Sequence, residues 1–162
     1  MTRKGTTSDL SALVERRLSR LTPWWAREVA IEPGNEGRIV DYMAFRPAAR
    51  TDTATGGDVE RGTFSFFEVK SCMADFESGH GLNFEGDENF LVCERELADK
   101  LYRALRLPLA AAVLVPDKSR TRLIEAYHAP GDPYRTGRTR SAAFLLFQIM
   151  RRMAGRQGLA AS

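Results

Sequence analysis

Periodic apolar positions divide the chain into segments of two kinds. Spacings of three and four residues, typical of helices with one buried face, occur near both ends and once in the middle. Short apolar runs bounded by Gly, Pro or Asn are typical of strands. The pattern predicts helices at 9–21, 94–105 and 141–153, with strands at 27–31, 38–45, 62–70, 89–93, 110–115 and 121–127.

This order of elements predicts a mixed central sheet with helices on its faces, which is a three-layer α/β sandwich. The chain has 162 residues, 43% of them hydrophobic, which is enough for one domain with a proper core. We expect a single domain at 9–156 between flexible tails at 1–8 and 157–162. An exposed loop at 47–61 would let the second and third strands pair antiparallel.

The sequence shows no targeting or membrane-spanning pattern. Its first eight residues are polar, and the longest apolar stretch, 107–116, is about half the length of a membrane-spanning helix. We therefore expect a cytoplasmic protein without a membrane partner. Cys72 and Cys93 form no C-x-x-C pattern and have no histidine at zinc spacing, so we expect small, buried thiols.

The net charge of +3 conceals an uneven distribution. Residues 101–162 contain eleven Lys or Arg against three acids, whereas the remainder contains thirteen against eighteen. Adjacent basic and acidic halves suit a polyanion-binding surface beside a cation-holding site. Basic residues that only solvate helices would give the same counts, so this alternative stays open.

Acidic residues interrupt two of the apolar runs. Asp41 lies within 38–45, and 62–70 ends in Glu68-Val69-Lys70. Side chains alternate along a strand, so Glu68 and Lys70 share a face, and antiparallel pairing would bring Asp41 near Glu68. A surface ion pair is the simpler alternative, but acids that follow apolar neighbours would be costly to desolvate without a cation.

Two carboxylates on adjacent strands can hold Mg²⁺, a hard cation that takes carboxylate oxygens and retains several waters. Asp41 and Glu68 are the expected metal ligands, and the backbone carbonyl of Val69 is placed to add an oxygen. Lys70 can reach an attacking water or a phosphate oxygen. Phosphodiester hydrolysis needs such a set: a cation, an activated water and a group that positions the water.

In this order the motifs resemble the PD-(D/E)xK nuclease superfamily, which has a restriction-endonuclease-like fold. Val40-Asp41 corresponds to its second motif and Glu68-Val69-Lys70 to its third. The continuation is similar to small bacterial and phage-type members, with Ser71, Asp75-Phe76, Asn83-Phe84 and the segment 86–90. The resemblance covers about residues 10–128 and departs at Val40, which replaces a frequent proline.

The resemblance implies a Mg²⁺-dependent nuclease that hydrolyses DNA, with Mn²⁺ able to substitute for Mg²⁺ and RNA as an alternative substrate. It also implies an acid from the first helix, which Glu15 would supply, with Glu28 as its competitor. The expected catalytic residues are thus Asp41, Glu68, Lys70 and Glu15. The main alternative is a catalytically inactive module of the same fold that binds nucleic acid or a protein. The apolar last helix would also suit a homodimer interface.

Other polar residues are expected to have structural roles. His80 and His128 are isolated histidines, Asp75 and Asp87 suit turns or loop caps, and Ser71 has no His-Asp partner that would make it a nucleophile. A third alternative is a protein-interaction domain that does not bind nucleic acid. It requires that the C-terminal arginines be dispersed rather than gathered on the face of Glu68: Arg135, Arg138, Arg140, Arg151, Arg152 and Arg156.

Overall fold

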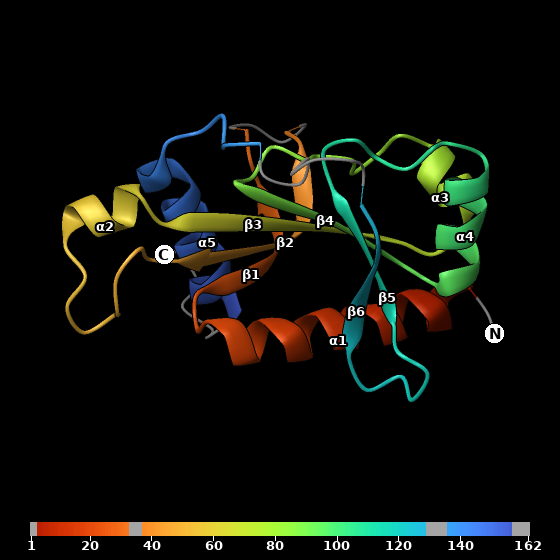
Figure 1. Ribbon diagram of the computed structural model, residues 1–162. Helices are drawn as coiled ribbons and strands as arrows, with labels where there is room; N and C mark the ends of the chain where they lie inside the picture. The colour runs from red at the N-terminus through yellow and green to blue at the C-terminus, as the bar shows by residue number, and fades with distance from the viewer. Residues whose placement is uncertain (1–2, 33–36, 129–135, 157–162) are drawn as a thin grey trace.

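The computed structural model describes residues 3–32, 37–128 and 136–156, which form one mixed sheet with helices on both faces (Figure 1). The strands are β1 (Trp25–Ala30), β2 (Ile39–Arg46), β3 (Thr63–Lys70), β4 (Glu88–Cys93), β5 (Ala112–Pro116) and β6 (Leu123–Tyr127). The helices are α1 (Arg3–Leu21), α2 (Gly56–Glu60), α3 (Met73–Glu77), α4 (Arg95–Arg103) and α5 (Ala142–Arg156). The predicted three-layer α/β sandwich is confirmed.

The strands follow one another across the sheet in chain order from β1 to β6. β3, β4 and β5 run parallel, and the other neighbours pair antiparallel. Parallel neighbours need crossover connections, which contain α3 and α4 here. The expected antiparallel pairing of β2 with β3 is confirmed, with Tyr42 opposite Phe67 and Met43 opposite Phe66.

One face of the sheet is covered by α1, which lies below it in Figure 1. Leu10, Leu13, Val14 and Leu18 of this helix recur at spacings of three and four residues and are all buried. They belong to one apolar cluster with strand residues such as Phe67. The apolar stripe predicted for the first helix therefore packs on the sheet.

The opposite face carries two separate apolar clusters. Leu145 of α5 shares one with Phe66 of β3, and Leu101 of α4 shares the other with Leu91 of β4. Glu68 follows the first cluster along β3 and lies opposite Leu91 in the strand register. The buried acid therefore lies at the junction between the two clusters.

The expected start of the first helix at position 9 is wrong, because the helix begins at Arg3. Thr6 is buried and Thr7 lines a pocket. Tertiary packing of this kind stabilises helical turns that local sequence does not specify. The tail expected at 157–162 lies outside the described residues.

Two other expectations about local structure are also wrong. The segment 47–61 is not loop throughout, because it contains α2, where the Thr55 side chain accepts a hydrogen bond from the N–H of Asp58. The helix expected to reach 105 ends at Arg103. Leu105 therefore leaves the apolar stripe, with a φ of 54° and 93% of its surface exposed.

Within residues 3–32, 37–128 and 136–156, every helix is too short or too polar to cross a bilayer. The two cysteines form no disulfide within the described part of the chain; Cys93 is buried as expected, whereas Cys72 is partly exposed.

Candidate functional site

Asp41 and Glu68 are brought together where β2 and β3 cease to pair. The register places Tyr42 opposite Phe67, so Asp41 and Glu68 are the next residues on the two antiparallel strands. Cross-strand neighbours present their side chains on the same face. The charge of Asp41 contributes to a raised pKa of Glu68, which reflects how close the two carboxyl groups lie.

The alternation of faces is interrupted on β2 beside Asp41, and the backbone of the neighbouring β1 is also irregular. Val40 and Met43 of β2 belong to the same apolar cluster although they are three positions apart. On β1, Glu28 has a left-handed φ of 50°, a conformation that costs a non-glycine residue about 1–2 kcal/mol. Backbone strain of this kind concentrates at functional sites. The irregularity therefore marks the neighbourhood of Asp41 and Glu28.

The carboxyl group of Glu68 is fully buried. Its Oε1 accepts a hydrogen bond from the backbone N–H of Asn83 at 3.3 Å, whereas Oε2 has no hydrogen-bond partner among the described residues. Burial, reinforced by the charge of Asp41, raises the pKa of Glu68 to about 9. At neutral pH the group therefore keeps its proton unless a cation replaces it.

Asp41 lies between a backbone donor and two charged neighbours. Its Oδ2 accepts a hydrogen bond from the N–H of Val69 at 2.7 Å. Burial raises the pKa of Asp41, while the Val69 hydrogen bond and the charge of Lys70 act in the opposite direction. Its carboxylate is therefore partly compensated even without a cation.

Lys70 is buried and held from two sides. Its ammonium group donates a hydrogen bond to the carbonyl of His80, and its Nζ lies 3.9 Å from Oδ1 of Asp75. Asp75 in turn accepts hydrogen bonds from the N–H and the hydroxyl of Ser71, at 2.9 and 3.0 Å. Ser71 and Asp75 therefore position Lys70, in keeping with the structural roles expected for them.

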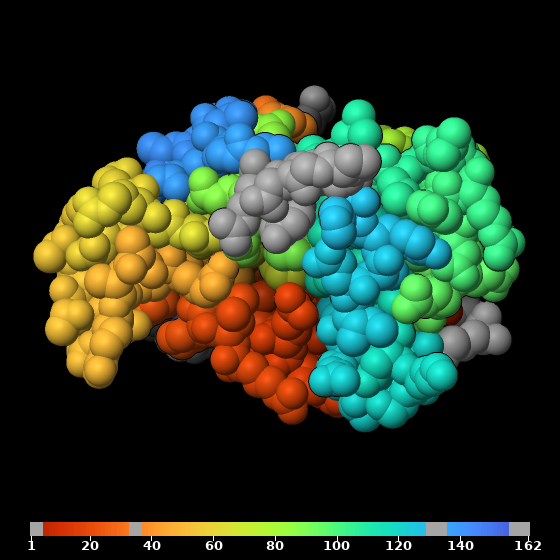
Figure 2. All heavy atoms as spheres, viewed as in Figure 1, coloured from red at the N-terminus to blue at the C-terminus, as the bar shows by residue number. Residues whose placement is uncertain are grey.

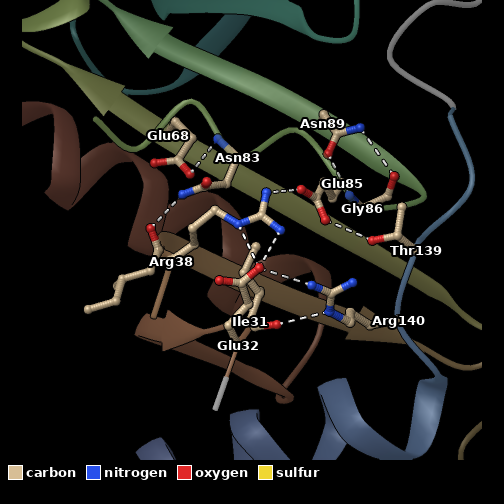
Figure 3. A network of polar contacts seen from close by, with 11 residues as sticks. Ile31, Glu32, Arg38, Glu68, Asn83, Glu85, Gly86, Asn89, Thr139 and Arg140 are labelled. Carbon is tan, nitrogen blue, oxygen red and sulfur yellow. Dashed lines mark hydrogen bonds and ion pairs between the residues drawn. The ribbon is translucent and has the colours of Figure 1, made fainter. Parts of the chain in front are cut away.

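The segment 80–83 closes over both charged residues of β3. It supplies the His80 carbonyl to Lys70. It also supplies the Asn83 N–H to Glu68, a contact that Figure 3 shows. The side-chain amide of Asn83 also donates to the carbonyl of Ile39 at 2.9 Å. Asn83 thus joins this segment to the β2 strand that carries Asp41.

The backbone of Gly81 passes so close to the site that it leaves little room for a side chain. A Cβ at this position would lie 3.1 Å from Oε2 of Glu68 and 3.4 Å from Nζ of Lys70, and its φ is +68°. Both features favour glycine. The sequence did not identify Gly81 or Asn83 as site residues. The repeated glycine at Gly79 and Gly81 was the signal available, since it indicates left-handed backbone.

A polar network attaches this segment to the rest of the protein (Figure 3). Arg38 bonds to Glu32 at 2.8 Å and also to Glu85, which accepts the hydroxyl of Thr139 at 2.7 Å. Arg140 reaches Glu32 at 3.2 Å. Since these side chains are partly exposed, their ion pairs contribute little to stability. Their effect is to connect the ends of β1 and β2 to the segments before β4 and α5.

A pocket of about 360 Å³ opens beside Asp41 and Lys70. Its wall comes from α1, β1, β2, the end of β3 and the residues that follow: Thr7, Ser11, Arg27, Glu28, Asp41, Tyr42, Val69, Lys70, Ser71 and Asp75. Most of these residues are polar, as a site for a charged substrate requires.

The two candidates for an additional acid occupy different places. Glu28 lies in the pocket wall, with its carboxylate 2.7 Å from Arg152. Glu15 is not part of this wall; it accepts a hydrogen bond from the hydroxyl of Tyr42 at 3.0 Å and lies 3.3 Å from Arg27. The structure therefore brings Glu28, and not Glu15, to the pocket.

Asp41 and Glu68 are not joined by a third ligating side chain. Throughout the described parts of the chain, no three His, Cys, Asp or Glu side chains gather as a metal-binding group. Mg²⁺ usually retains several waters and is bound by one or two carboxylates. Two converging carboxylates therefore remain compatible with a Mg²⁺ site.

Two other polar residues have the structural roles expected for them. Asp87 accepts the N–H of Phe64 at 2.8 Å and pairs with Arg138 at 2.9 Å. His128 lies 2.7 Å from Glu125 on the surface. Both lie away from the pocket wall described above.

The C-terminal arginines are engaged in separate internal contacts. Those in the described residues bond to side chains or carbonyls of different elements: Arg138, Arg140, Arg151 and Arg152. Arg135 and the side chain of Arg156 lie outside the described residues. Because these arginines are already bonded to protein groups, the basic C-terminal third does not by itself identify a polyanion-binding surface.

Replacing Gly81 with Ala should weaken cation binding beyond any loss of stability. The added Cβ would crowd Glu68 and Lys70, and displacing groups that orient metal ligands typically costs 10–100-fold in affinity. Titration with Mn²⁺ followed by calorimetry measures the change.

Gly79→Ala is the matched control, because Gly79 has a φ of +70° and nothing lies within 4 Å of its added Cβ. Both variants should lose about 1–2 kcal/mol of stability from left-handed strain, but only Gly81→Ala should lose affinity. Equal Mn²⁺ affinities in the two variants would contradict a role of Gly81 in the site.

Comparison with solved structures supports the architecture. The SPO1766 protein of unknown function from Silicibacter pomeroyi is similar to this chain, with a TM-score of 0.53, over 94% of this chain and 88% of that one. The sequence identity is 20%, which indicates a common fold and carries no information about activity. Neither a protein-family model nor a curated protein matches the chain. The chain is therefore assigned to a three-layer α/β sandwich fold that it shares with this neighbour.

Proposed function

We propose that the protein is a Mg²⁺-dependent nuclease of the restriction-endonuclease-like fold that hydrolyses DNA in the cytoplasm, with Mn²⁺ able to replace Mg²⁺. The observation that supports this most strongly is the buried carboxyl group of Glu68 beside Asp41. Its Oε2 has no partner among the described residues. While Glu68 is protonated it can share a side-chain hydrogen bond with Asp41; once it ionises, its buried charge is costly, and a bound cation would offset that cost.

Asp41 and Glu68 would supply the carboxylate oxygens that hold the cation. The N–H of Val69 already faces Asp41, and the N–H and C=O of one residue lie at the same edge of a strand, so its carbonyl would add an oxygen. This set of hard oxygen donors fits Mg²⁺. When bound, the cation would neutralise charge on the phosphoryl group and supply an activated water.

Lys70 would position the attacking water or a phosphate oxygen. It follows Glu68 on the same face, and the His80 carbonyl and Asp75 restrict its ammonium group. A compact ammonium with three donors suits this role. Glu28 is the acid that the pocket favours as an additional carboxylate, in place of the Glu15 that the family resemblance favours.

A catalytically inactive module of the same fold is the alternative, and one observation favours it. Only two carboxylates converge within the described residues, and Glu68 is covered by the segment 80–83. Such a module would bind nucleic acid or a protein without cutting. Cation binding and cleavage are therefore measured separately in the experiments.

Asp41→Asn should abolish cleavage of DNA in the presence of Mg²⁺ or Mn²⁺. The amide can still accept the Val69 N–H, so the strand junction is kept while the charge that binds the cation is lost. A bound metal ion typically contributes several kcal/mol of transition-state charge stabilisation. Gel assays with single-stranded, double-stranded and branched DNA give the rate.

Glu15→Gln serves as the matched control, since Glu15 lies outside the pocket wall, and its cleavage rate should stay near that of the wild type. Wild-type protein that cuts none of these substrates would leave the inactive module as the better account. Cleavage that survives in Asp41→Asn would exclude Asp41 from the reaction.

A further inference from the structure

A second hollow lies along the C-terminal half of α1, on the side of the helix that faces β6. It has a volume of about 450 Å³, and four arginines line it: Arg16, Arg17, Arg20 and Arg122. In Figure 2, the red α1 and the cyan segment around β6 lie side by side on the face shown. The pocket beside Asp41 includes none of these arginines.

The arginines of α1 retain most of their capacity to bind an anion. Arg16 donates one hydrogen bond to the carbonyl of Thr121 at 2.9 Å, and Arg17 lies over the ring of Phe90 at 5.9 Å. Neither they nor Arg20 form an ion pair within the described residues, whereas Arg122 lies 3.3 Å from Asp117. Three cationic groups without a carboxylate partner therefore share one hollow.

The floor of the hollow is apolar. Leu13 and Leu123 are buried beneath it, and Ile124 and the 41%-exposed Leu21 complete it. An arginine rim above an apolar floor matches a ligand that has both phosphates and a flat apolar surface. A polynucleotide with unstacked bases has this combination.

A neighbouring hollow of about 250 Å³ shares Arg17 and Leu21 with the first. Phe90 and Arg46 also line it, together with two carboxylates, Glu88 and Glu125, and Arg46 lies 2.9 Å from Glu88. Phe90 is buried, and the two carboxylates would repel a phosphate. Phosphate contacts are therefore expected in the arginine-lined hollow and not in this neighbouring one.

We propose that the groove between α1 and β6 binds a single-stranded polynucleotide, with Arg16, Arg20 and Arg122 contacting phosphates and the apolar floor accepting a base. A duplex exposes its phosphates but keeps its bases stacked, so it would engage only the rim. The preference for a polynucleotide over other polyanions rests on the proposed nuclease function. The groove itself lies outside the pocket of Asp41 and Lys70, so it is an anchor separate from the cutting site.

The test is fluorescence anisotropy in EDTA with a labelled single-stranded oligonucleotide, its duplex and a polyglutamate peptide. The triple variant Arg16→Ala, Arg20→Ala, Arg122→Ala should bind the single strand at least about tenfold more weakly, and its slope of log affinity against log salt should fall by about 2, since each lost phosphate contact removes about 0.7. If the triple variant folds poorly, the single variant Arg20→Glu serves instead. It removes no described ion pair and should also weaken binding of the single strand.

A control triple variant, Arg50→Ala, Arg61→Ala, Arg103→Ala, removes the same net charge from exposed positions elsewhere. It should bind as the wild type does. Equal losses in both triple variants, or unchanged binding in the groove variants, would overturn the proposal. Polyglutamate that binds as tightly as the single strand would identify an acidic protein surface instead, and equal duplex binding would overturn the preference for a single strand.

These outcomes are independent of the metal site. Cleavage requires a cation, which EDTA removes, and the groove variants should bind Mn²⁺ like the wild type. If the wild type never cuts DNA but the groove variants lose binding, the groove remains and the nuclease proposal falls. If the wild type cuts DNA and the groove variants bind the single strand normally, the nuclease proposal stands and the groove proposal falls.

Discussion

Glu68→Gln should abolish cation binding and, without metal, make the protein more stable than the wild type in alkaline solution. Burial raises the pKa of this carboxyl to about 9 in the folded protein, against an ordinary value of 4.5 for glutamate. Between these values the folded state binds a proton that the unfolded state has lost, so rising pH favours unfolding of the wild type. Glutamine fills the same space without a group that must ionise.

The size of this effect is set by the cost of ionising Glu68 in a buried site. We expect the two proteins to differ little near pH 4.5, and the variant to gain on the order of a few kcal/mol at pH about 9, or several degrees in Tm. Thermal unfolding in EDTA across this range measures it. Glu60→Gln, an exposed carboxyl in α2, should leave the pH dependence unchanged.

Addition of Mn²⁺ near pH 8 should then make the wild type more stable than Glu68→Gln. Ligand binding stabilises the wild type in proportion to RT ln(1 + [L]/Kd), and Glu68→Gln should gain nothing, because its amide is a poor ligand. Apparent affinity of the wild type should rise about tenfold per pH unit below the pKa of Glu68, since the cation replaces one proton. Identical Mn²⁺ stabilisation of both proteins would remove Glu68 from the metal site.

Lys70→Met should lower the cleavage rate by about 100-fold or more, while leaving the affinity for Mn²⁺ at least as high as in the wild type. Methionine keeps the length of the buried chain but removes the ammonium group that would position the water or phosphate. It also removes a positive charge close to the cation, which would otherwise repel it. Cleavage assays and calorimetry on the same preparations separate the two effects.

Lys100→Met provides the matched substitution at an exposed lysine of α4 and should change neither quantity. A Lys70→Met variant that loses both cleavage and Mn²⁺ binding would point to general damage at the site. If instead the variant still cuts at the wild-type rate, Lys70 has no part in the reaction.

The sequence predicted the proximity of Asp41 and Glu68 because both lie in short apolar runs, and two such runs joined by a polar loop pair antiparallel. Gly81 and Asn83 could not be placed in the same way. Their segment returns across the strand ends through contacts such as the Asn83 amide to the Ile39 carbonyl, and no local pattern encodes such a return.

The additional acid shows a different limit of sequence reasoning. A helical wheel puts Glu15 beside the apolar stripe of α1, but it does not say which strand that edge meets. In the fold the edge meets Tyr42 and Arg27. Glu28 reaches the pocket through an irregularity in β1, and the φ of 50° behind it has no sequence signal.

The charge counts showed that the chain has an excess of basic residues, but they did not show where those residues gather on the surface. Arginines of the basic C-terminal third, such as Arg138 and Arg152, are engaged in bonds to Asp87 and Glu28. The arginine-lined groove instead joins Arg20 of α1 to Arg122 at the start of β6. Residues so far apart in the chain meet only because α1 crosses the sheet beneath β6.

The position of Glu68 between two apolar clusters has a consequence for how the protein tolerates change. Because Leu145 and Leu101 belong to clusters without common members, substitutions in the two should have additive effects on stability. The packing beneath α5 and beneath α4 can therefore vary independently over evolution, or be redesigned one at a time, while the acid at the boundary keeps its surroundings.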